Sequence, residues 1–519
     1  MGALGELHTG LRGSADPQRP DLGNTSEGKQ GIPPPLRVVF CAAALPRTNG
    51  GRKQESMQQP VSDAVWRIET NGGNPVEADL RHGSLRDLFW VWFAANLAIV
   101  GLVLGAAVMS YGLAFWQGLL AILGAFSFVL IGYFAIPGAR TGVPTMILSR
   151  ATFGTRGNLL PSLVSWLNLV GWETVVLVVA TYALEGVFRR LFGLGASAGT
   201  LTLALLVVMV VAFSVALLGH ATLVRVQTVF SYIFGVLTIG VAIWLVPHIN
   251  FARTLSLPAG PWLTGFLPAL SIVVAGTGLS WVNTAADYTR YLKRDTPSRG
   301  IVGATTWGAV IPAVCLMVLG ALLYSGMPAL ATSGNYIDLL EHALPAWLAV
   351  PYLLTAVASM VTGDIMDIYS SGLSLLAARL RVARYKTVVV DAVLSGAASL
   401  YVILAAHNFI ATFSAFLTLL AAVLAPWAAV FLVDLSTRLR GGINVSGLYA
   451  DQAGPYAGVR WPALVAWLFG LLLGLSLTSS TLWSGPLAHG VFQESNLGYL
   501  VGFVVAAAVY AALGGVKER

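Results

Sequence analysis

The segment LSIVVAGTGLSWVNTAADYTRYL, residues 270–292, starts as an apolar helix and is interrupted at residues 275–278 by the run AGTG. Glycine is a poor helix former, so this run predicts a break in the middle of an apolar span. A second segment, FWVWFAANLAIVGLVLGA at residues 89–106, places Asn96 between small residues at mid-membrane. Paired interrupted spans are typical of transporters built from inverted repeats, because their freed backbone groups can hold an ion and a substrate.

Close packing between helices is the alternative explanation for glycine in a membrane span. The AGTG run does not stand alone, however, because Ser280, Trp281 and Asn283 follow it directly. Polar and aromatic side chains immediately after two glycines favour a binding site over packing alone.

The rest of the chain has the composition of a membrane protein. Of its 519 residues, 56% are hydrophobic and 10% are charged, whereas roughly 25% are charged in a typical soluble protein. Apolar blocks long enough to cross about 30 Å of hydrocarbon recur after residue 85. Since lipid-facing backbone must satisfy its own hydrogen bonds, we expect an all-α integral membrane protein with about twelve transmembrane helices. The spans are expected near residues 87–108, 112–136, 160–187, 199–219, 223–247, 264–286, 301–325, 346–376, 388–405, 408–434, 461–479 and 494–514.

The two interrupted spans are the first and the sixth of this series, so each opens a unit of five helices. We expect one five-helix repeat at residues 85–247 and a second, inverted repeat at 264–434. A cytoplasmic loop at 435–460 and two extra helices with a short tail at 461–519 complete the chain.

The loops differ in their basic residues according to the side on which they lie. Loops on the side of the leader carry most of the Lys and Arg, whereas the opposite loops carry Arg189, Arg190 and Arg253. The positive-inside rule therefore predicts that both termini are cytoplasmic, in a multi-pass protein of the inner or plasma membrane.

The leader, residues 1–84, is rich in Gly, Pro, Arg and Ser and contains no apolar segment that resembles a secretory signal. We expect it to be cytoplasmic and largely disordered. A different kind of sequence begins at Met57, which leaves open whether residues 1–56 belong to the mature protein.

Several function classes are excluded or disfavoured by what the chain lacks. Cys41 lies in the leader and Cys315 in an apolar span, so they form neither a disulfide framework nor a metal knuckle. The net charge is +7, but the basic residues are scattered over short loops between the spans. Membrane topology explains this distribution better than nucleic-acid binding does. The spans contain no nucleophile triad, phosphate loop or zinc spacing, so we expect no enzyme and no cofactor apart from a coupling ion.

Charged residues inside apolar spans are rare, face inward and usually serve function. Three carboxylates, Asp364, Asp367 and Glu173, are the clearest cases here. Asp364 and Asp367 are three residues apart and therefore share one helix face with Ser371, close to Thr362. Such a face suits a hydrogen-bonding substrate, a sodium ion or a proton. A structural polar network between helices is the alternative.

The third carboxylate, Glu173, follows Trp172 in the sequence VGWET. A Trp at mid-membrane can stack on a flat ligand, and a neighbouring carboxylate can accept from ring N–H groups or bind a proton. Asp287 and Arg290 lie near the cytoplasmic end of the sixth span, where charge is less costly, and we expect a structural or gating role for them.

Two other functions also use polar groups embedded in the membrane. An intramembrane aspartyl protease needs two embedded aspartates, for which Asp287 and Asp364 could serve, but its Gly-x-Gly-Asp pattern is absent. A channel is the other rival, and it does not require paired interrupted helices.

Five segments carry a resemblance to a known family. They are RHGSLRDLFWVWFAANLAIVG (81–101), ARTGVPTMILSRATFGTRGN (139–158), LVGWET (169–174), LSWVNTAADYTRYLKRDTPSR (279–299) and GDIMDIYSSGL (363–373). They resemble the purine-cytosine permease branch of the nucleobase:cation symporter family, which also contains the cytosine and hydantoin permeases. The resemblance runs from about Trp66 to the end of the chain.

The resemblance implies a leucine-transporter-like fold with alternating access, and a flat heterocycle stacked between the third and sixth spans. Trp172 matches the third-span aromatic of the family. The sixth-span aromatic falls on Gly278, so Trp281 would have to replace it, and Ser280 matches a polar contact of the cytosine permease. A substrate-binding Asn of relatives falls at or near Asp367, where an acid would prefer the amine or protonated ring of an aminopyrimidine.

The family's sodium site combines first-span carbonyls with small and hydroxyl residues of the eighth span. Here the resemblance places it at Ala95 to Ala98 together with Ala358, Val361 and Thr362, where Val361 replaces a hydroxyl. Fungal members of the family are thought to use protons, which Glu173, Asp364 or Asp367 could carry. The coupling ion is therefore expected to be either sodium or a proton.

We therefore expect a secondary active symporter that imports a nucleobase or a related heterocycle, such as cytosine, a purine or a pyrimidine vitamin precursor. Its predicted partners are this small molecule and the lipid bilayer, without nucleic acid. The sequence leaves the oligomeric state open.

Overall fold

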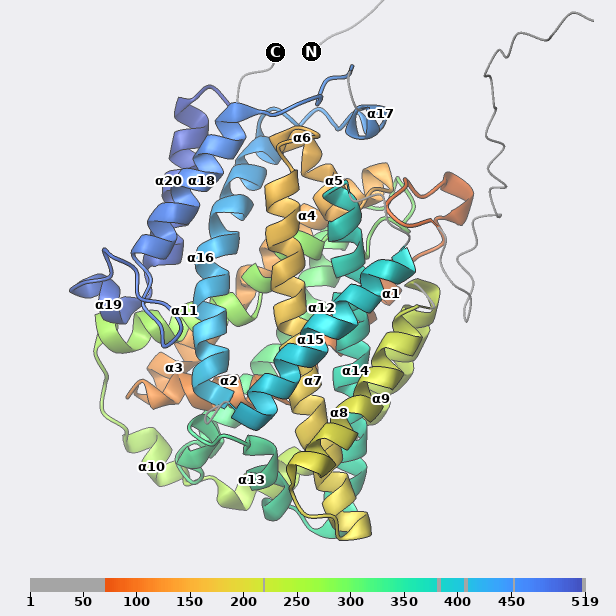
Figure 1. Ribbon diagram of the computed structural model, residues 1–519. Helices are drawn as coiled ribbons and strands as arrows, with labels where there is room; N and C mark the ends of the chain where they lie inside the picture. The colour runs from red at the N-terminus through yellow and green to blue at the C-terminus, as the bar shows by residue number, and fades with distance from the viewer. Residues whose placement is uncertain (1–70, 218–219, 380–383, 406–408, 451–452, 516–519) are drawn as a thin grey trace, which may run out of the picture. The chain divides into compact units, whose positions relative to one another are not determined.

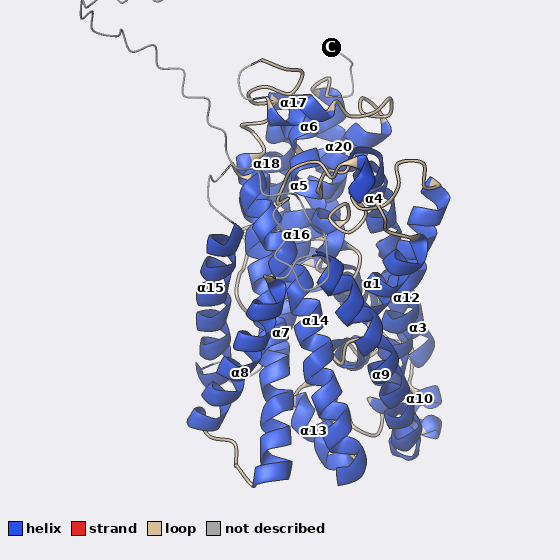
Figure 2. Cartoon of the chain, turned by 90° about the vertical axis from the view of Figure 1, so that its right-hand side faces the viewer, coloured by secondary structure: helices blue, strands red, loops and turns tan. Residues whose placement is uncertain are grey.

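The computed structural model describes residues 71–515 apart from 218–219, 380–383, 406–408 and 451–452. Within these residues the chain is helical and forms no strand, as Figure 2 shows. The helices that build the spans are α1 (Leu85–Asn96), α2 (Val100–Ser110), α3 (Phe115–Ile122), α4 (Phe128–Thr141), α7 (Leu159–Phe192), α8 (Ala198–Ala216), α9 (His220–Leu245), α11 (Leu267–Gly276), α12 (Ser298–Leu323), α14 (Ala346–Ala377), α15 (Arg384–Ala405), α16 (Phe409–Ser436), α18 (Trp461–Ser476) and α20 (Gly498–Ala512). Short helices lie in the connections: α5 (Thr145–Leu148), α6 (Arg150–Phe153), α10 (Phe251–Ser256), α13 (Tyr336–Ala343), α17 (Val445–Tyr449) and α19 (Val491–Ser495).

The described helices account for most of the predicted spans. Within the described residues, nine continuous stretches are long and apolar enough to cross a membrane, and the bent pair α1–α2 makes a tenth. The helices α18 and α20 are apolar but only 16 and 15 residues long, which is below the length of the others. The all-α membrane fold is confirmed, and a count of twelve spans stays a prediction.

Both predicted interruptions are present. Helix α1 ends at Asn96 and α2 begins at Val100, and the two axes differ by 57°. Helix α11 ends at Gly276, and after a break at Thr277 the chain continues as the 3₁₀ segment Leu279–Thr284. Weak helix formers at these positions thus end each helix inside its span, as the sequence predicts.

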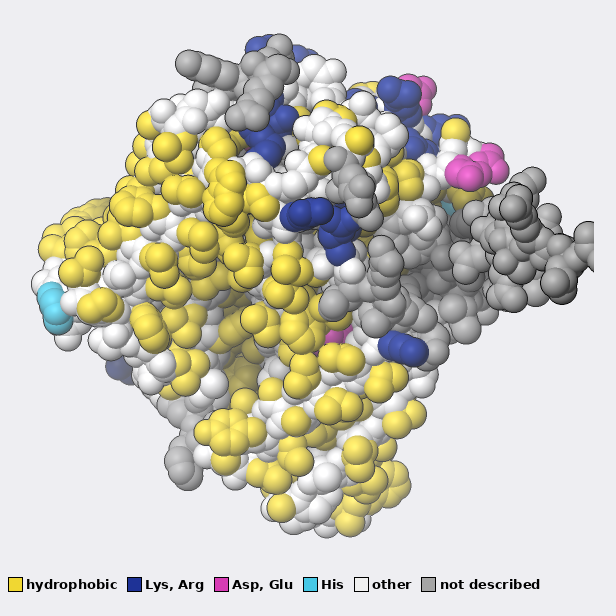
Figure 3. Space-filling view, turned by 45° about the horizontal axis from the view of Figure 1, so that its top comes forward, with side chains coloured by type: hydrophobic (Ala, Val, Ile, Leu, Met, Phe, Trp, Pro, Cys, Tyr) yellow, Lys and Arg dark blue, Asp and Glu magenta, His cyan; other side chains and the backbone are white. Residues whose placement is uncertain are grey.

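The two longest described helices, α7 and α14, have 34 and 32 residues and pack along one another (Figure 1). On the other side of the molecule α18 and α20 lie together against α16. Many large hydrophobic side chains remain exposed on the described helices, as expected where lipid rather than water covers the surface. Figure 3 shows them in yellow, with Lys and Arg gathered mainly toward the top of the view.

Helices α2 and α12 approach one another at backbone distance. A Cβ atom added to Gly105 would lie 1.9 Å from the carbonyl oxygen of Met317, and one added to Gly320 would lie 1.8 Å from that of Leu102. Only glycine permits contact this close, which is a common device of helix packing in membranes. The first span is therefore fixed tightly to α12.

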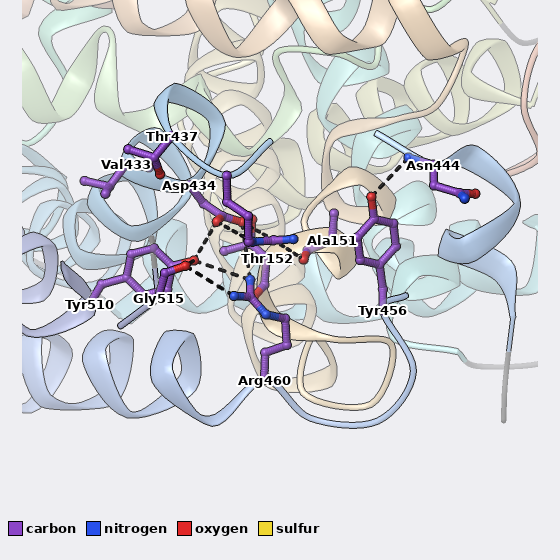
Figure 4. Close-up of polar contacts among 11 residues, drawn as sticks. Ala151, Thr152, Val433, Asp434, Thr437, Asn444, Tyr456, Arg460, Tyr510 and Gly515 are labelled. Atoms are coloured by element: carbon purple, nitrogen blue, oxygen red, sulfur yellow. Dashed lines mark hydrogen bonds and ion pairs between the residues drawn. The ribbon is translucent and has the colours of Figure 1, made fainter. Parts of the chain in front are cut away.

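The short helices α18 and α20 are held by a buried carboxylate at the end of α16 (Figure 4). Asp434 accepts hydrogen bonds from the hydroxyls of Thr152 and Tyr510 at 2.7 and 2.6 Å, and Arg438 and Arg460 pair with it. Burial alone would lower the pKa of Arg438, but the carboxylate of Asp434 holds that pKa above its usual value. The carboxylate of Asp434 thus links α6, the end of α16, the start of α18 and α20.

The described end of the leader lies on the loops between the spans. The amide of Val76 donates to the carbonyl of Gly142 at 2.9 Å, and the amide of Gly83 donates to that of Tyr291 at 3.0 Å. The remainder of the leader, including Cys41 and the stretch whose membership was left open, lies outside the described residues.

Candidate functional site

A small cavity of about 80 Å³ lies between the two helix breaks. Its wall combines small side chains, aromatic rings and few polar groups. The residues that line it are Ala95, Asn96, Ala98, Val100, Gly101, Leu104, Trp172, Val176, Gly276, Thr277, Trp281, Ala313, Met317, Ser359, Met360, Gly363, Asp367 and Phe413. The breaks of the first and sixth spans, α7, α12, α14 and α16 therefore all contribute to one site.

Two indole rings line this cavity, one from α7 and one from the 3₁₀ segment after the second break. Trp172 of α7 packs edge-on against Phe413 and Phe416, with ring centroids 5.9 and 5.7 Å apart. Trp281, after the second break, packs edge-on against Trp92 at 5.7 Å. These contacts fix both indoles in place, and a flat ligand could stack on rings held in this way.

At the first break, α14 supplies a hydroxyl to a carbonyl that the interrupted helix frees. The Oγ of Ser359 donates to the carbonyl of Leu97 at 2.9 Å. The hydroxyl of Thr362 donates in turn to the carbonyl of Ser359 at 2.8 Å, and its own carbonyl accepts from Gln227 at 3.4 Å. In this conformation the carbonyl of Leu97 and the hydroxyl protons of Ser359 and Thr362 are engaged in protein hydrogen bonds.

At the second break, freed groups bind the connection between α3 and α4. The amide of Gly278 donates to the Oγ of Ser127 at 3.2 Å, and the hydroxyl of Thr277 lies 3.3 Å from the same atom. The hydroxyl of Ser280 donates to the carbonyl of Thr277 at 2.8 Å. The break is thus stabilised by side chains, as buried backbone groups require.

Asp367 is the one carboxylate in the wall of this cavity. Its side chain is 1% exposed, and its Oδ1 has no hydrogen-bond partner among the residues that the structure describes. A buried carboxylate oxygen without a donor is costly unless a ligand or a proton satisfies it. The position is therefore suited to recognising a donor on a bound molecule.

Three further carboxylates lie beside Asp367 without lining the cavity. They are Glu173, Asp364 and Asp391, and Asp364 and Asp391 lie close enough to Glu173 for their carboxyl groups to interact with it. Both oxygens of Glu173 and of Asp364 are buried and lack a hydrogen-bond partner within the described chain. None of these acids forms an ion pair with a described Lys, Arg or His, so the cluster carries no compensating cation there.

Asp391 was missed in the sequence analysis. It lies near the start of α15 and accepts from the indole of Trp166 at 2.6 Å and from the hydroxyl of Ser371 at 2.7 Å. The signal was present, since Asp391 is a charge within an apolar segment, but its link to α14 depends on the fold.

A hydrogen-bonded network of polar side chains was also missed in the sequence analysis, although one member, Asn283, was noted there. The hydroxyl of Ser165 lies 2.9 Å from that of Ser374 and accepts from Asn283 at 2.7 Å. Asn168 donates to the carbonyl of Ser280 at 3.3 Å. This network joins α7, α14 and the 3₁₀ segment that follows the second break.

The structure brings together some of the predicted site residues and separates others. Those that line the cavity are Ala95, Ala98, Trp172, Trp281 and Asp367. Those that do not are Glu173, Gly278, Ser280, Ala358, Thr362 and Asp364. A Cβ atom added to Gly278 would lie 2.2 Å from the backbone of Ser127, so this position faces the α3–α4 connection and has no room for a ring.

Asp287, beyond the end of the sixth span, anchors a loop. Its Oδ1 accepts from the amide and the hydroxyl of Thr145 at 2.8 and 3.0 Å. Burial raises the pKa of Asp287 to about 6, and the hydrogen bonds from Thr145 oppose that shift. Arg290 is fully buried and lies over the ring of Tyr291 at 5.2 Å. Neither residue lines the cavity.

Comparison with known proteins adds three findings. A family model described as a permease for cytosine/purines, uracil, thiamine and allantoin matches residues 75–502. YxlA, a Bacillus subtilis (strain 168) protein whose name assigns it provisionally to the purine-cytosine permeases, is 27% identical over 452 residues, which is 83% of this chain and 93% of YxlA. The purine-cytosine permease FCY2 of Saccharomyces cerevisiae is 28% identical over 270 residues, covering 50% of this chain and 48% of FCY2.

Solved structures show the fold. Mhp1, a nucleobase-cation-symport-1 family transporter in a closed conformation with bromovinylhydantoin bound, matches with a TM-score of 0.70 at 18% identity, covering 86% of this chain and 95% of Mhp1. A Na⁺-coupled sialic acid symporter matches with a TM-score of 0.56 at 12% identity, covering 85% of this chain and 93% of that protein. These likenesses confirm the predicted transporter fold.

Proposed function

Because this chain belongs to the family of permeases for cytosine/purines, uracil, thiamine and allantoin, we propose that it imports a flat nitrogen heterocycle by alternating access. It is a transporter and not an enzyme, and the substrate class is a nucleobase or a close relative, such as cytosine, a purine or a pyrimidine vitamin precursor. Import follows the gradient of a coupling cation.

The observation that carries this proposal is the cavity between the two breaks. It presents Trp172 for stacking and one carboxylate, Asp367, for recognition of a ligand donor. A mostly apolar site with a few placed polar groups is typical of small-molecule binding. At about 80 Å³ the cavity is small, so the occupied site must widen around the ligand.

The chemistry of Asp367 narrows the substrate. A carboxylate accepts hydrogen bonds and donates none while ionised, so it selects amine or protonated ring groups over carbonyl groups. We therefore propose an aminopyrimidine or aminopurine as the preferred substrate, with its ring on Trp172.

For the coupling ion we propose a proton, carried by Glu173 and Asp364 beside the cavity. Both side chains are fully buried and have no hydrogen-bond partner in the described part of the chain. A carboxyl group in that setting is costly as an anion, and a proton removes the cost. The sodium alternative places the ion at Ala95, Ala98, Ala358 and Thr362, where Ser359 and Thr362 already make protein hydrogen bonds.

We propose further that both termini are cytoplasmic. At the opposite end of the spans, Arg190 pairs with Glu341 at 2.7 Å, and Arg189 contacts both Glu341 and Asp338. Two of the three basic residues on that side, Arg189 and Arg190, are thus neutralised locally, which supports the assignment of the more basic end to the cytoplasm.

The repeat assignment belongs to the same proposal. The segments 85–247 and 264–434 are proposed to be inverted copies, each opening on a broken span. The loop 435–460 and the pair of helices in 461–519 follow outside the repeats.

Uptake of radiolabelled cytosine into proteoliposomes tests these assignments. A proton gradient and a sodium gradient are imposed separately, with unlabelled purines, hydantoins and hydroxymethylpyrimidine as competitors. We expect concentrative uptake with the proton gradient, and competition by ligands that carry an exocyclic amine. Uptake that follows only the sodium gradient would overturn the proton assignment, and a lack of binding by every heterocycle would overturn the substrate class.

A further inference from the structure

Two larger cavities lie away from the breaks, at the end of the spans where the basic loops gather. Their volumes are about 760 and 430 Å³. Both are lined by Arg140, Thr141, Arg294 and the loop 441–443, so they form one continuous depression. We call this depression the basic groove. It shares no residue with the cavity at the helix breaks.

The groove is strongly positive. Among the described residues, five cations line it, namely Arg81, Arg140, Lys293, Arg294 and Arg440, against a single acid, Asp295. Among the residues that the structure describes, none of these cations forms an ion pair with a carboxylate. Burial, and after it the charge of Arg294, lowers the pKa of Arg81, as expected where like charges meet.

Arg140 makes hydrogen bonds but leaves its charge uncompensated. Its guanidinium donates to the carbonyls of Arg294 and Thr296 and to the hydroxyl of Ser298, the last at 2.8 Å. All three partners are neutral groups. Arg140 is thereby fixed in position, and the side chains of Arg294 and Arg440 are exposed beside it.

The second part of the groove is apolar and leads to the lipid-facing surface. Its wall includes Tyr133, Ile136 and Pro137 of α4 together with Leu435 and Leu439 at the end of α16. These side chains line the same cavity as Arg140, Arg294 and Arg440.

The apolar wall continues along one face of a single span. Val129, Tyr133, Ile136 and Arg140 of α4 follow one another at intervals of three or four residues, which places them on one side of that helix. Phe126 lies just before them, in the preceding 3₁₀ segment. Phe126 and Val129 are 40% and 47% exposed, although they lie in an apolar span. A strip that begins against the lipid chains therefore ends at Arg140.

We propose that the basic groove binds one anionic glycerophospholipid from the surrounding leaflet. The phosphate lies among Arg140, Arg294 and Arg440, and an acyl chain follows the strip from Tyr133 toward Phe126. Arginine suits phosphate because its planar fork donates two hydrogen bonds at once. Basic pockets beside membrane helices attract anionic lipids by the same electrostatics. The apolar wall selects a lipid over a soluble anion, because a free phosphate gains nothing from it.

Native mass spectrometry of the purified protein tests the proposal. The protein is reconstituted with phosphatidylcholine containing a minor fraction of phosphatidylglycerol, and the retained lipids are identified. We expect selective retention of phosphatidylglycerol by the wild type. Each of Arg294→Gln and Arg440→Gln should lower that retention roughly fivefold, and the double variant should lower it further. Both side chains are exposed, so neither change should impair folding.

Arg156→Gln is the matched control, because Arg156 is an exposed cation of the neighbouring loops that does not line the groove. It should retain phosphatidylglycerol as the wild type does. An equal loss in this control would show general attraction to charge, and equal retention of phosphatidylcholine would show no headgroup selection. If glycerol 3-phosphate displaced the retained phosphatidylglycerol as readily as added phosphatidylglycerol does, the groove would be a site for small anions. Each of these outcomes would overturn the proposal.

Discussion

The substitution Asp434→Asn tests whether one buried charge holds the last two helices to the rest of the chain. Oδ1 of Asp434 accepts from Tyr510 at 2.6 Å and from Nε of Arg438 at 2.9 Å. Oδ2 accepts from Thr152 at 2.7 Å and from Nη2 of Arg438 at 2.5 Å, and it lies 3.5 Å from Arg460. Asparagine has the same shape, so the change removes charge and acceptor capacity without leaving a cavity.

Either orientation of the new amide turns its NH₂ group toward an N–H of Arg438. Arginine cannot accept a hydrogen bond, so at least one charge-assisted bond is lost, at a cost of about 1.5–3 kcal/mol. Removing one partner of a buried ion pair costs about 3–5 kcal/mol in total. Because Arg438 and Arg460 are 13% and 20% exposed and reach some water, we expect a loss of about 3 kcal/mol, at the lower end of that range.

Equilibrium unfolding in mixed micelles, followed by tryptophan fluorescence, measures this loss. The control is Thr437→Ala, on the next turn of the same segment, whose hydroxyl bonds only to the carbonyl of Val433 at 2.6 Å. The control should change the free energy of unfolding by less than about 0.5 kcal/mol. If Asp434→Asn is no less stable than Thr437→Ala, the Asp434 network does not anchor α18 and α20 as described.

Four further changes address the site and its surroundings. Asp367→Asn should abolish high-affinity uptake while the protein remains in the membrane, and normal uptake would exclude a role in binding. Glu173→Gln should abolish uptake driven by a proton gradient but keep substrate exchange, so unchanged proton-driven uptake would remove Glu173 from the coupling path. Thr362→Ala should leave uptake independent of sodium if a proton is the coupling ion, whereas a rise in the sodium concentration for half-maximal uptake would place an ion at this residue. Gly105→Ala should sharply reduce the amount of folded protein on size-exclusion chromatography, because its Cβ would lie 1.9 Å from a backbone oxygen. Gly240→Ala is its control, since an added Cβ there would meet no atom within 4 Å. This control should match the wild type, or its free energy of unfolding should rise by up to about 1 kcal/mol.

The breaks were predictable because their causes are local. Glycine and asparagine weaken a helix wherever they stand, so the sequences at Asn96 and at residues 275–278 identify both interruptions without the fold. The lengths of α18 and α20 were less predictable, because the apolar residues at their ends continue into connections that the pattern does not separate from helix.

The sequence spacing of Asp364 and Asp367 did not predict which of the two lines the cavity. Asp364 and Asp367 share a helix face, but a step of three residues still leaves them about 60° apart around the axis. That angle turns Asp367 into the cavity and Asp364 toward Glu173 and Asp391. Gly278 shows the same limit, since the family resemblance predicts it in the substrate site whereas packing turns it toward Ser127.

The backbone contact between α2 and α12 limits how the protein can move. Close-packed interfaces behave as rigid units, and this one has no layer of side chains that could rearrange to let the helices slide. The two helices should therefore travel together between the outward-open and inward-open states. Gly101 and Met317 line the cavity from these two helices, and Ser359 of α14 also lines it and donates to the carbonyl of Leu97. We expect α14 to part from the first break when the substrate enters, so spin-label distances between α14 and α2 should change while those between α2 and α12 stay constant.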